Sequence, residues 1–208
     1  MTEASLRPDE ATARILRQKV VPVVRMTSVD AAQENCSQLI AAGLSVIELT
    51  TTTPGWRELL GTLVSENPTA VIGLGTVTNA ENADAACELG ASFLVSPYPA
   101  PEARRVARDA GRLFVGGGIT PAEVAASAAY GLCKLFPAHL GGIAYLKSLT
   151  AIMPTAMIMP TGGVRISEVG RWLASGAAAV GLGSDLSSAP DLDAAIGELA
   201  VQLKLCPS

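Results

Sequence analysis

One pattern recurs eight times along this chain: a short apolar segment, a loop rich in Gly, Thr, Ser or Pro, and an alanine-rich helical segment. The predicted strands are residues 20–25, 45–50, 70–75, 92–96, 113–117, 132–136, 157–160 and 178–181. The predicted helices between and after them are 30–42, 56–66, 80–89, 100–110, 121–130, 143–149, 167–174 and 192–205, and a further helix, 8–18, precedes the first strand. Strict alternation of strand and helix is typical of a parallel sheet covered by helices.

Glycines punctuate this pattern where short helix-to-strand loops need them. Several predicted helices end just before such a residue, at Gly43, Gly90, Gly111, Gly131 and Gly176. Glycine adopts the left-handed conformation that commonly terminates a helix, so we expect helix C-caps at these positions. Eight repeats without a break in composition predict an α/β fold, a closed (β/α)8 barrel with a short N-terminal helix. An open, doubly wound sheet is the alternative.

The composition agrees with a single packed domain spanning residues 1–208. Hydrophobic residues make up 49% and charged residues 16% of the chain, which excludes a disordered protein and suits strands that are covered on both faces. Aromatic residues contribute only 4%, so small and aliphatic side chains must fill the core.

The charge pattern limits the classes of partner. The formal net charge is -4, and the longest basic run is Arg104-Arg105, so we expect no nucleic-acid partner. No apolar run approaches the ~18 residues of a membrane span, and the N-terminal segment lacks the apolar core of a secretion signal. We therefore expect a cytoplasmic protein with no membrane partner.

The chain offers few metal ligands of the sulfur or imidazole type. Its four cysteines, Cys36, Cys87, Cys133 and Cys206, form no C-x-x-C pair, so they are expected to be small buried thiols. His139 is the only histidine, which argues against a histidine-rich metal site or a Ser-His-Asp triad. We expect it to be a polar loop residue at the barrel mouth, and we expect no metal and no cofactor.

Two charged residues stand in predicted strands that are otherwise apolar. Lys134 lies within YGLCKLFPA, and Glu48 lies within SVIELTTTT. Burying either charge is costly unless it is neutralised or paired. A desolvated lysine favours its neutral, nucleophilic form, and a buried carboxyl group can carry protons. The alternatives are a lysine that reaches outward to water and a structural salt bridge, in which Lys134 and Glu48 could be partners.

Two glycine-rich loops follow the last two predicted strands. PTGGV occupies residues 160–164 and GLGSDL occupies 181–186. Glycines let backbone N–H groups approach an anion closely, and these two loops of a barrel often bind phosphate. Each could also be an ordinary tight turn. Together they predict a phosphorylated or otherwise anionic ligand.

Other polar residues occur at predicted strand ends, where barrel enzymes keep their chemistry. Arg25 ends the first strand and could reach a carboxylate or phosphate, although a surface position explains it equally well. Thr76 follows the third strand, and the threonines at 50–53 follow Glu48. These hydroxyl groups could bind substrate or satisfy loop backbone groups.

The chain resembles the bacterial 2-keto-3-deoxy-6-phosphogluconate (KDPG) aldolases, also called 4-hydroxy-2-oxoglutarate (KHG) aldolases. The resemblance spans nearly the whole chain and depends on several segments in register. They are VVPVVR, AGLSVIELTTTTPG, IGLGTVTNAENADAACELGASFLVSP, ITPAEVAASAAYGLCKLFPA, HLGGIAYLKSL and MPTGGVRISEVGRWLASGAAAVGLGSDL.

This resemblance implies a role for each matched residue. Lys134 would form a Schiff base with the substrate ketone, and Glu48 would move protons. The implied substrate-binding residues are Arg25, Thr52, Thr76, Phe136 and Thr161, and the implied phosphate-binding residues are Gly162, Gly163, Gly183 and Ser184. It also implies a homotrimeric, metal-independent lyase that cleaves KDPG to pyruvate and glyceraldehyde 3-phosphate, and KHG to pyruvate and glyoxylate.

Three positions depart from the family pattern in the predicted pocket. Some members carry an arginine where this chain has Thr52, so recognition of the substrate carboxylate would fall to Arg25 or be weaker. His139 replaces a residue that is commonly Glu or Ser, and residues 116–118 are three glycines where a Pro-Gly pair is usual. These departures bear on the identity of the substrate more than on the Lys134–Glu48 chemistry.

Several readings therefore remain open from the sequence. The mechanism could serve the galactonate epimer, KHG or an unphosphorylated keto acid. A barrel of this kind could also bind a phosphorylated metabolite without Schiff-base chemistry, as an isomerase or a sensor. A structural trimeric scaffold fits poorly with two charged residues in apolar strands.

Overall fold

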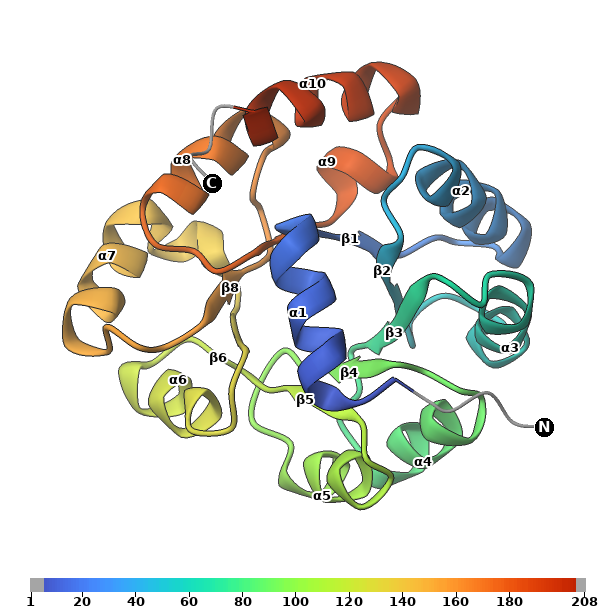
Figure 1. Ribbon diagram of the computed structural model, residues 1–208, viewed down its shortest axis with the longest axis horizontal. Coiled ribbons are helices and arrows are strands. Elements are labelled where there is room, and N and C mark those ends of the chain that lie inside the picture. The colour runs from blue at the N-terminus through green and yellow to red at the C-terminus, as the bar shows by residue number, and fades with distance from the viewer. Residues whose placement is uncertain (1–5, 205–208) are drawn as a thin grey trace.

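The computed structural model describes residues 6–204, and its elements alternate as the sequence predicts (Figure 1). The strands are β1 (Val20–Val24), β2 (Val46–Thr50), β3 (Val71–Gly75), β4 (Phe93–Val95), β5 (Leu113–Val115), β6 (Gly117–Gly118), β7 (Cys133–Leu135), β8 (Ile158–Pro160) and β9 (Val180–Leu182). The α-helices are α1 (Pro8–Gln18), α2 (Val29–Ala41), α3 (Trp56–Glu66), α4 (Ala80–Glu88), α5 (Pro101–Asp109), α6 (Pro121–Ala128), α7 (Gly142–Ile152), α8 (Val169–Ala174), α9 (Ser184–Ser187) and α10 (Leu192–Lys204). Two 3-10 turns, η1 (Ala138–Leu140) and η2 (Ile166–Glu168), complete the set.

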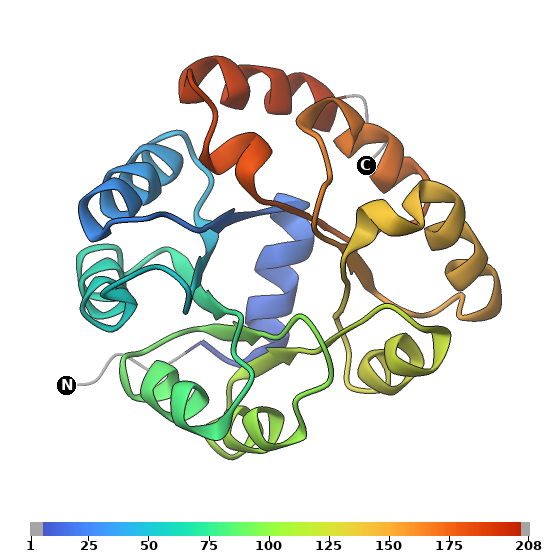
Figure 2. The ribbon, with the colours of Figure 1, turned by 180° about the vertical axis from the view of Figure 1, so that it is seen from behind.

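All strand pairs are parallel and together they close into a barrel. Six strands run in the order β5-β4-β3-β2-β1-β9, and three more run in the order β6-β7-β8. The chain passes from β5 to β6 through Gly116 alone, and a bridge between Thr161 and Gly181 joins the β8 edge to β9. The helices surround the strands in both views (Figures 1 and 2). The predicted (β/α)8 barrel is therefore confirmed, and the alternative of an open, doubly wound sheet is excluded.

The N-terminal end of the barrel is filled by apolar side chains and covered by α1, which crosses it in Figure 1. Ala11 and Ile15 of α1 are fully buried in one cluster with Phe93 and Met159 from the strands. Full burial of an Ile, Phe or Met side chain contributes about 1.5–3 kcal/mol. The side-chain amide of Gln18 bonds the backbone of Val46 in both directions, which ties α1 to β2. The N-terminal end of the barrel is therefore an apolar core. We expect the polar site residues at the opposite end.

The structure differs from the predicted boundaries at several elements. The fifth predicted strand, 113–117, is interrupted at Gly116, and the eighth, 178–181, begins only at Val180. The helix predicted at 167–174 starts as the turn η2, and neither η1 nor α9 was predicted. The helix predicted at 192–205 is described as far as Lys204, and Leu205 lies outside the described residues.

The interruption of the fifth strand has a packing cause. Backbone atoms of Ser96 and Pro97 press against Gly117 so closely that a Cβ there would collide with them. At Gly116, a Cβ would meet the guanidinium of Arg104 at 2.5 Å. Glycine at both positions therefore allows neighbouring groups to approach the strand, at the cost of regular pairing.

The predicted glycine caps are confirmed. All five have positive φ angles, which are 89° at Gly43, 88° at Gly90, 66° at Gly111, 114° at Gly131 and 99° at Gly176. A residue with a Cβ would be strained in this conformation, whereas glycine is not.

The cysteines behave largely as small core residues. Cys36 and Cys133 are buried, Cys87 is partly buried, and all three are free thiols. Burial raises the pKa of both Cys36 and Cys133 to about 12. Cys206 lies outside the described residues. Between residues 6 and 204, no helix is long and apolar enough to cross a membrane.

Candidate active site

A cavity of about 440 Å³ opens at the C-terminal ends of the barrel strands. Its lining residues are Val23, Arg25, Glu48, Thr76, Pro97, Lys134, Phe136, Thr161, Gly162, Gly163, Gly183, Ser184 and Ser187. Every predicted site residue except Thr52 is in this set. Residues from seven strands or the loops that follow them thus meet at one place, as barrel geometry requires.

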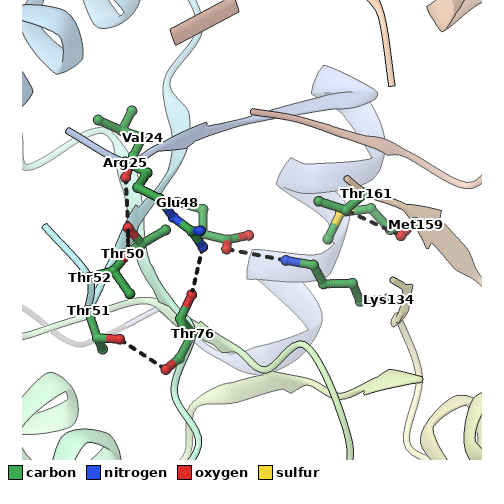
Figure 3. Close-up of polar contacts among 10 residues, drawn as sticks. All are labelled: Val24, Arg25, Glu48, Thr50, Thr51, Thr52, Thr76, Lys134, Met159 and Thr161. Carbon is green, nitrogen blue, oxygen red and sulfur yellow. Dashed lines mark hydrogen bonds and ion pairs between the residues drawn. The ribbon is translucent and has the colours of Figure 1, made fainter. Parts of the chain in front are cut away.

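Lys134 and Glu48 form the buried centre of the cavity. Lys134 lies on β7 and Glu48 on β2, and the two side chains point toward one another across the barrel (Figure 3). The amine Nζ of Lys134 donates to Oε1 of Glu48 at 3.4 Å. Only 4% of Lys134 and none of Glu48 is exposed. The lysine therefore points inward. A buried charge needs a partner of opposite charge, and each of these two residues provides one for the other.

Local packing leaves the second oxygen of Glu48 available. Oε2 is buried and has no hydrogen-bond partner within residues 6–204. Backbone of Gly75 on β3 makes room for the carboxylate, because a Cβ at that position would collide with it. A buried carboxylate oxygen without a partner is unusual in folded proteins and is well suited to accept a proton from a bound ligand.

Arg25 and Thr76 form a second polar group beside Glu48. Arg25 follows β1 and Thr76 follows β3, so they flank the strand that carries Glu48. Nη2 of Arg25 donates to Oγ1 of Thr76 at 3.4 Å, as Figure 3 shows. Thr76 has a φ of 61°, a rare conformation for a β-branched residue. Arg25 is exposed at the cavity mouth, where its guanidinium can meet an anionic ligand.

The two glycine-rich loops lie on the other side of the cavity. Gly162 and Gly163 have φ angles of 91° and 72°, and the side chain of Thr161 just before them is 4% exposed. Gly183 precedes α9, whose first residue is Ser184. Oδ2 of Asp185 accepts a hydrogen bond of 2.7 Å from the backbone N–H of Ile166, which fixes the two loops relative to each other.

His139 contacts the first of these loops from η1. Its backbone N–H donates to the carbonyl of Gly162 at 3.1 Å, and its Nδ1 lies 3.3 Å from the same oxygen. The ring packs against Gly163, where a Cβ would come within 2.7 Å of the His139 Cβ. The expected loop position at the barrel mouth is confirmed, and the residue holds the glycine loop in place.

Phe136 lines the cavity next to the lysine. The centre of its ring is 5.4 Å from Nζ of Lys134, and the ring also limits the space at Gly162. An aromatic face near an amine tolerates both its charged and its neutral form, and it excludes water from one side.

Three lining residues were not among the predicted site residues: Val23, Pro97 and Ser187. Ser187 is buried, and its hydroxyl donates to the carbonyl of Gly183 at 3.1 Å. It lies one turn after Ser184 on α9, so recognition of that short helix could have revealed it. Val23 is the inward-facing residue two positions before Arg25, which the alternation of β1 could have indicated.

Thr52 is placed outside the cavity lining. Its hydroxyl lies 3.0 Å from that of Thr50, and the residue is exposed in the loop after β2. The structure therefore does not bring it together with the other predicted site residues, and its role in binding substrate stays a prediction.

A second cavity of about 470 Å³ lies outside the barrel beside α5 and α6. Its four arginines include Arg105 and Arg108, which form ion pairs with Asp109. Among the described residues that line it there is no carboxylate and no lysine. Over residues 6–204, no group of three or more His, Cys, Asp or Glu side chains is arranged to hold a metal ion.

Fold and cavity together define a class of protein: a (β/α)8 barrel with a buried lysine–glutamate pair at its strand ends, next to two glycine-rich loops. Residues 12–197 match the KDPG and KHG aldolase family, and the chain belongs to this family of lyases.

Named relatives agree with this assignment. The chain is 33% identical over 157 residues to the 2-dehydro-3-deoxy-phosphogluconate aldolase of Zymomonas mobilis, covering 74% of this chain and 75% of the relative. It is 30% identical over 171 residues to the 2-dehydro-3-deoxy-6-phosphogalactonate aldolase of Escherichia coli, covering 80% and 83%. Among solved structures, the KDPG aldolase of Legionella pneumophila, with pyruvate captured as a covalent carbinolamine, has a TM-score of 0.78 at 26% identity and covers 94% of this chain and 96% of that one.

Proposed function

We propose that this protein is a class I aldolase that cleaves KDPG to pyruvate and glyceraldehyde 3-phosphate through a Schiff base on Lys134. The observation that carries the proposal is the buried contact between Lys134 and Glu48 in a cavity that ends at two glycine-rich loops. Metal ions have no part in this mechanism. The same site serves KHG, which it cleaves to pyruvate and glyoxylate.

The first stage joins substrate and enzyme. Lys134 gives its proton to Glu48 and attacks the C2 ketone as a neutral amine, which forms a carbinolamine. Protonation of the C2 hydroxyl by Glu48 lets it leave as water, and an iminium ion remains. Oε1 of Glu48 is 3.4 Å from the Lys134 amine, close enough for these transfers directly or with small adjustments.

The second stage breaks the carbon–carbon bond. Glu48 accepts the proton of the C4 hydroxyl, the C3–C4 electron pair moves into the iminium, and the C4 fragment leaves as an aldehyde. The protonated Glu48 then delivers this proton to C3 of the enamine, which becomes a methyl group, and the carboxylate is restored. Water then hydrolyses the pyruvate iminium and frees the Lys134 amine.

The two ends of the substrate bind on opposite sides of the reacting pair. Arg25 and Thr76 hold the carboxylate at C1, since they provide a guanidinium and a hydroxyl beside Glu48. The backbone N–H groups near Gly162, Gly163 and Gly183, with the Ser184 hydroxyl, hold the phosphate. Phe136 and Thr161 enclose the pyruvyl portion between these two subsites.

The galactonate epimer of KDPG is the second candidate substrate. It is favoured by the 30% identity to a 2-dehydro-3-deoxy-6-phosphogalactonate aldolase over 80% of this chain. The two epimers differ only at C4, where the hydroxyl group meets Glu48 in this mechanism. The Lys134 chemistry is the same for both.

The experiment compares pyruvate release from purified protein supplied with KDPG, its galactonate epimer, KHG and unphosphorylated 2-keto-3-deoxygluconate. We expect kcat/KM for a phosphorylated epimer to exceed that for the unphosphorylated acid by about tenfold or more, a difference of about 1.4 kcal/mol. The better epimer identifies the substrate. Equal rates with and without phosphate would contradict the phosphate subsite, and no pyruvate from any of the four would contradict the aldolase itself.

We also propose that the chain forms one domain and acts in the cytoplasm as a homotrimer. Membership of this aldolase family supports a small phosphorylated keto acid as substrate. Similarity to a protein cage designed by fusing symmetric oligomeric domains, with a TM-score of 0.80, supports a homo-oligomer. Light scattering on the purified protein measures the assembly directly, and a mass other than three chains would contradict the trimer.

A further inference from the structure

The loop after β2 contains threonines whose hydroxyl groups bond the backbone of the two neighbouring strand ends. We name residues Thr50, Thr51, Thr52 and Thr53 the threonine segment. Oγ1 of Thr50 donates to the carbonyl of Val24 at 3.2 Å, and Oγ1 of Thr53 accepts from the N–H of Met26 at 3.3 Å. These two bonds hold the peptide groups on either side of Arg25.

Thr51 makes the corresponding contacts on the other side, next to Thr76. Its backbone N–H donates to the carbonyl of Gly75 at 3.0 Å, and its Oγ1 donates to the carbonyl of Thr76, also at 3.0 Å. Figure 3 shows the second bond. The N–H of Val77 donates to the carbonyl of Val95 at 3.0 Å. The peptides before and after Thr76 are therefore both fixed, mainly by Thr51.

Thr76 needs such support because of its backbone conformation. Its φ of 61° places a β-branched residue in the left-handed region, which costs of the order of 1–3 kcal/mol. Such a conformation persists only when the surrounding structure fixes the peptide groups on both sides of the residue. The conformation directs the Thr76 hydroxyl toward Arg25 at 3.4 Å, within the cavity lining.

We infer that Thr51 is a positioning residue, which acts through Thr76 and Arg25 on binding of the substrate carboxylate. Its hydroxyl holds Thr76 in the left-handed conformation, and Thr76 in turn orients the Arg25 guanidinium. Thr51 itself does not line the cavity. The inference rests on the proposed function and extends it. Arg25 and Thr76 recognise the carboxylate, and the loop after Glu48 sets their geometry.

This arrangement also gives the threonine segment a function other than direct contact with substrate. Its bonds run to β1 on one side and to the end of β3 on the other, so the segment sets the separation of Arg25 and Thr76. Glu48 lies on the strand between them. A disturbance at Thr51 should therefore weaken binding of the carboxylate more than it slows the chemistry at Lys134.

The test uses Thr51→Val, which removes the hydroxyl with little change of shape, and Thr51→Ser, which keeps it. Thr62→Val, on the half-buried face of α3, is the matched control. For each protein, the extent of Lys134 reduction by borohydride is measured over a range of pyruvate concentrations. The kcat and KM for KDPG are measured in parallel, and thermal denaturation checks folding.

We expect Thr51→Val to raise the half-saturating pyruvate concentration and the KM about fivefold, the scale of one lost hydrogen bond, with kcat changed less than about twofold. Thr51→Ser and Thr62→Val should match the wild type. Unchanged half-saturation in Thr51→Val, or an equal increase in Thr51→Ser, would overturn the inference. Absence of any pyruvate adduct in the wild-type protein would instead overturn the proposed function on which the inference rests.

Discussion

The amine of Lys134 lies 3.4 Å from Oε1 of Glu48, although 86 positions separate the two residues in the chain. The contact crosses the barrel from β7 to β2 in a region where both side chains are almost fully buried. Such a pair is a weak source of stability, because desolvation offsets much of the attraction. Its location in a cavity at the strand ends fits a catalytic use.

Replacement of the lysine should abolish turnover. Lys134→Ala removes the one lysine among the described residues that line the cavity, so we expect no measurable pyruvate release, with a circular dichroism spectrum like that of the wild type. Lys147→Ala, an exposed change on α7, is the matched control and should retain full activity. Substantial residual turnover in Lys134→Ala would remove Lys134 from the mechanism.

Replacement of the carboxylate should slow proton transfer without removing the nucleophile. Glu48→Gln keeps the shape of the side chain, and we expect kcat to fall roughly 10²-fold or more, the usual scale for a lost general acid or base. Steady-state kinetics measure the effect, with Glu66→Gln at the exposed end of α3 as control. An unaffected rate would assign the proton transfers to another group.

The proposed binding of phosphate by the glycine-rich loops can be tested separately from the proposed chemistry of Lys134 and Glu48. Gly163→Ala introduces a Cβ at a φ of 72°, within 2.7 Å of the His139 Cβ, so the loop must shift. We expect KM for the phosphorylated substrate to rise about tenfold, while reaction of pyruvate with Lys134 stays within about twofold. Gly197→Ala on α10, where a new Cβ meets nothing within 4 Å, is the control.

Kinetic measurements on Gly163→Ala and Gly197→Ala show whether the glycine loop contributes to phosphate binding. If Gly163→Ala affected phosphorylated and unphosphorylated substrates equally, the loop would not be the phosphate site. If it left both unchanged, the glycine pair would be an ordinary turn.

The sequence predicted the barrel, because apolar strands and glycine caps are local signals. It left open whether Lys134 and Glu48 form a pair, and their catalytic roles were implied by the family resemblance. It could not show which way Lys134 points, since a side chain on a strand of a barrel faces either the interior or the helices. Only the pairing of β7 with its neighbours and the approach of Glu48 decide that the amine is buried.

Contacts between loops were harder to predict. The bond from Thr51 to the carbonyl of Thr76 depends on the register of β2 with β3, and the left-handed φ of Thr76 has no signal in its residue type. Thr52 was assigned to substrate from the family pattern, whereas the structure places its hydroxyl against Thr50. Side chains at adjacent loop positions point in different directions, so a motif match does not determine where the side chain of Thr52 points.

The strain at Thr76 should be measurable as stability. Glycine adopts a φ of 61° without a steric penalty, whereas alanine does not, so Thr76→Gly should be more stable than Thr76→Ala by about 1 kcal/mol. Both variants lose the hydroxyl and should bind pyruvate more weakly than the wild type. Urea denaturation provides the comparison, and a less stable Thr76→Gly would contradict the left-handed assignment.

The buried thiols should be inert in the folded protein. With a pKa of about 12, only about one in ten thousand of the Cys36 or Cys133 thiols is ionised at pH 8, and the thiolate is the reactive form. Peptide mapping after brief iodoacetamide treatment should find both unmodified until the protein is unfolded. Rapid labelling of Cys133 in the folded protein would show that β7, which also carries Lys134, is more accessible to solvent than the structure indicates.

A Schiff base on Lys134 is tested most simply by mass analysis of the protein after incubation with pyruvate and sodium borohydride, followed by peptide mapping. Reduction converts the iminium between pyruvate and lysine into a stable amine. We predict one reduced pyruvyl group per chain, located on Lys134 and absent from Lys134→Ala. No adduct, or an adduct on an exposed lysine such as Lys147, would contradict a Schiff-base mechanism at this cavity.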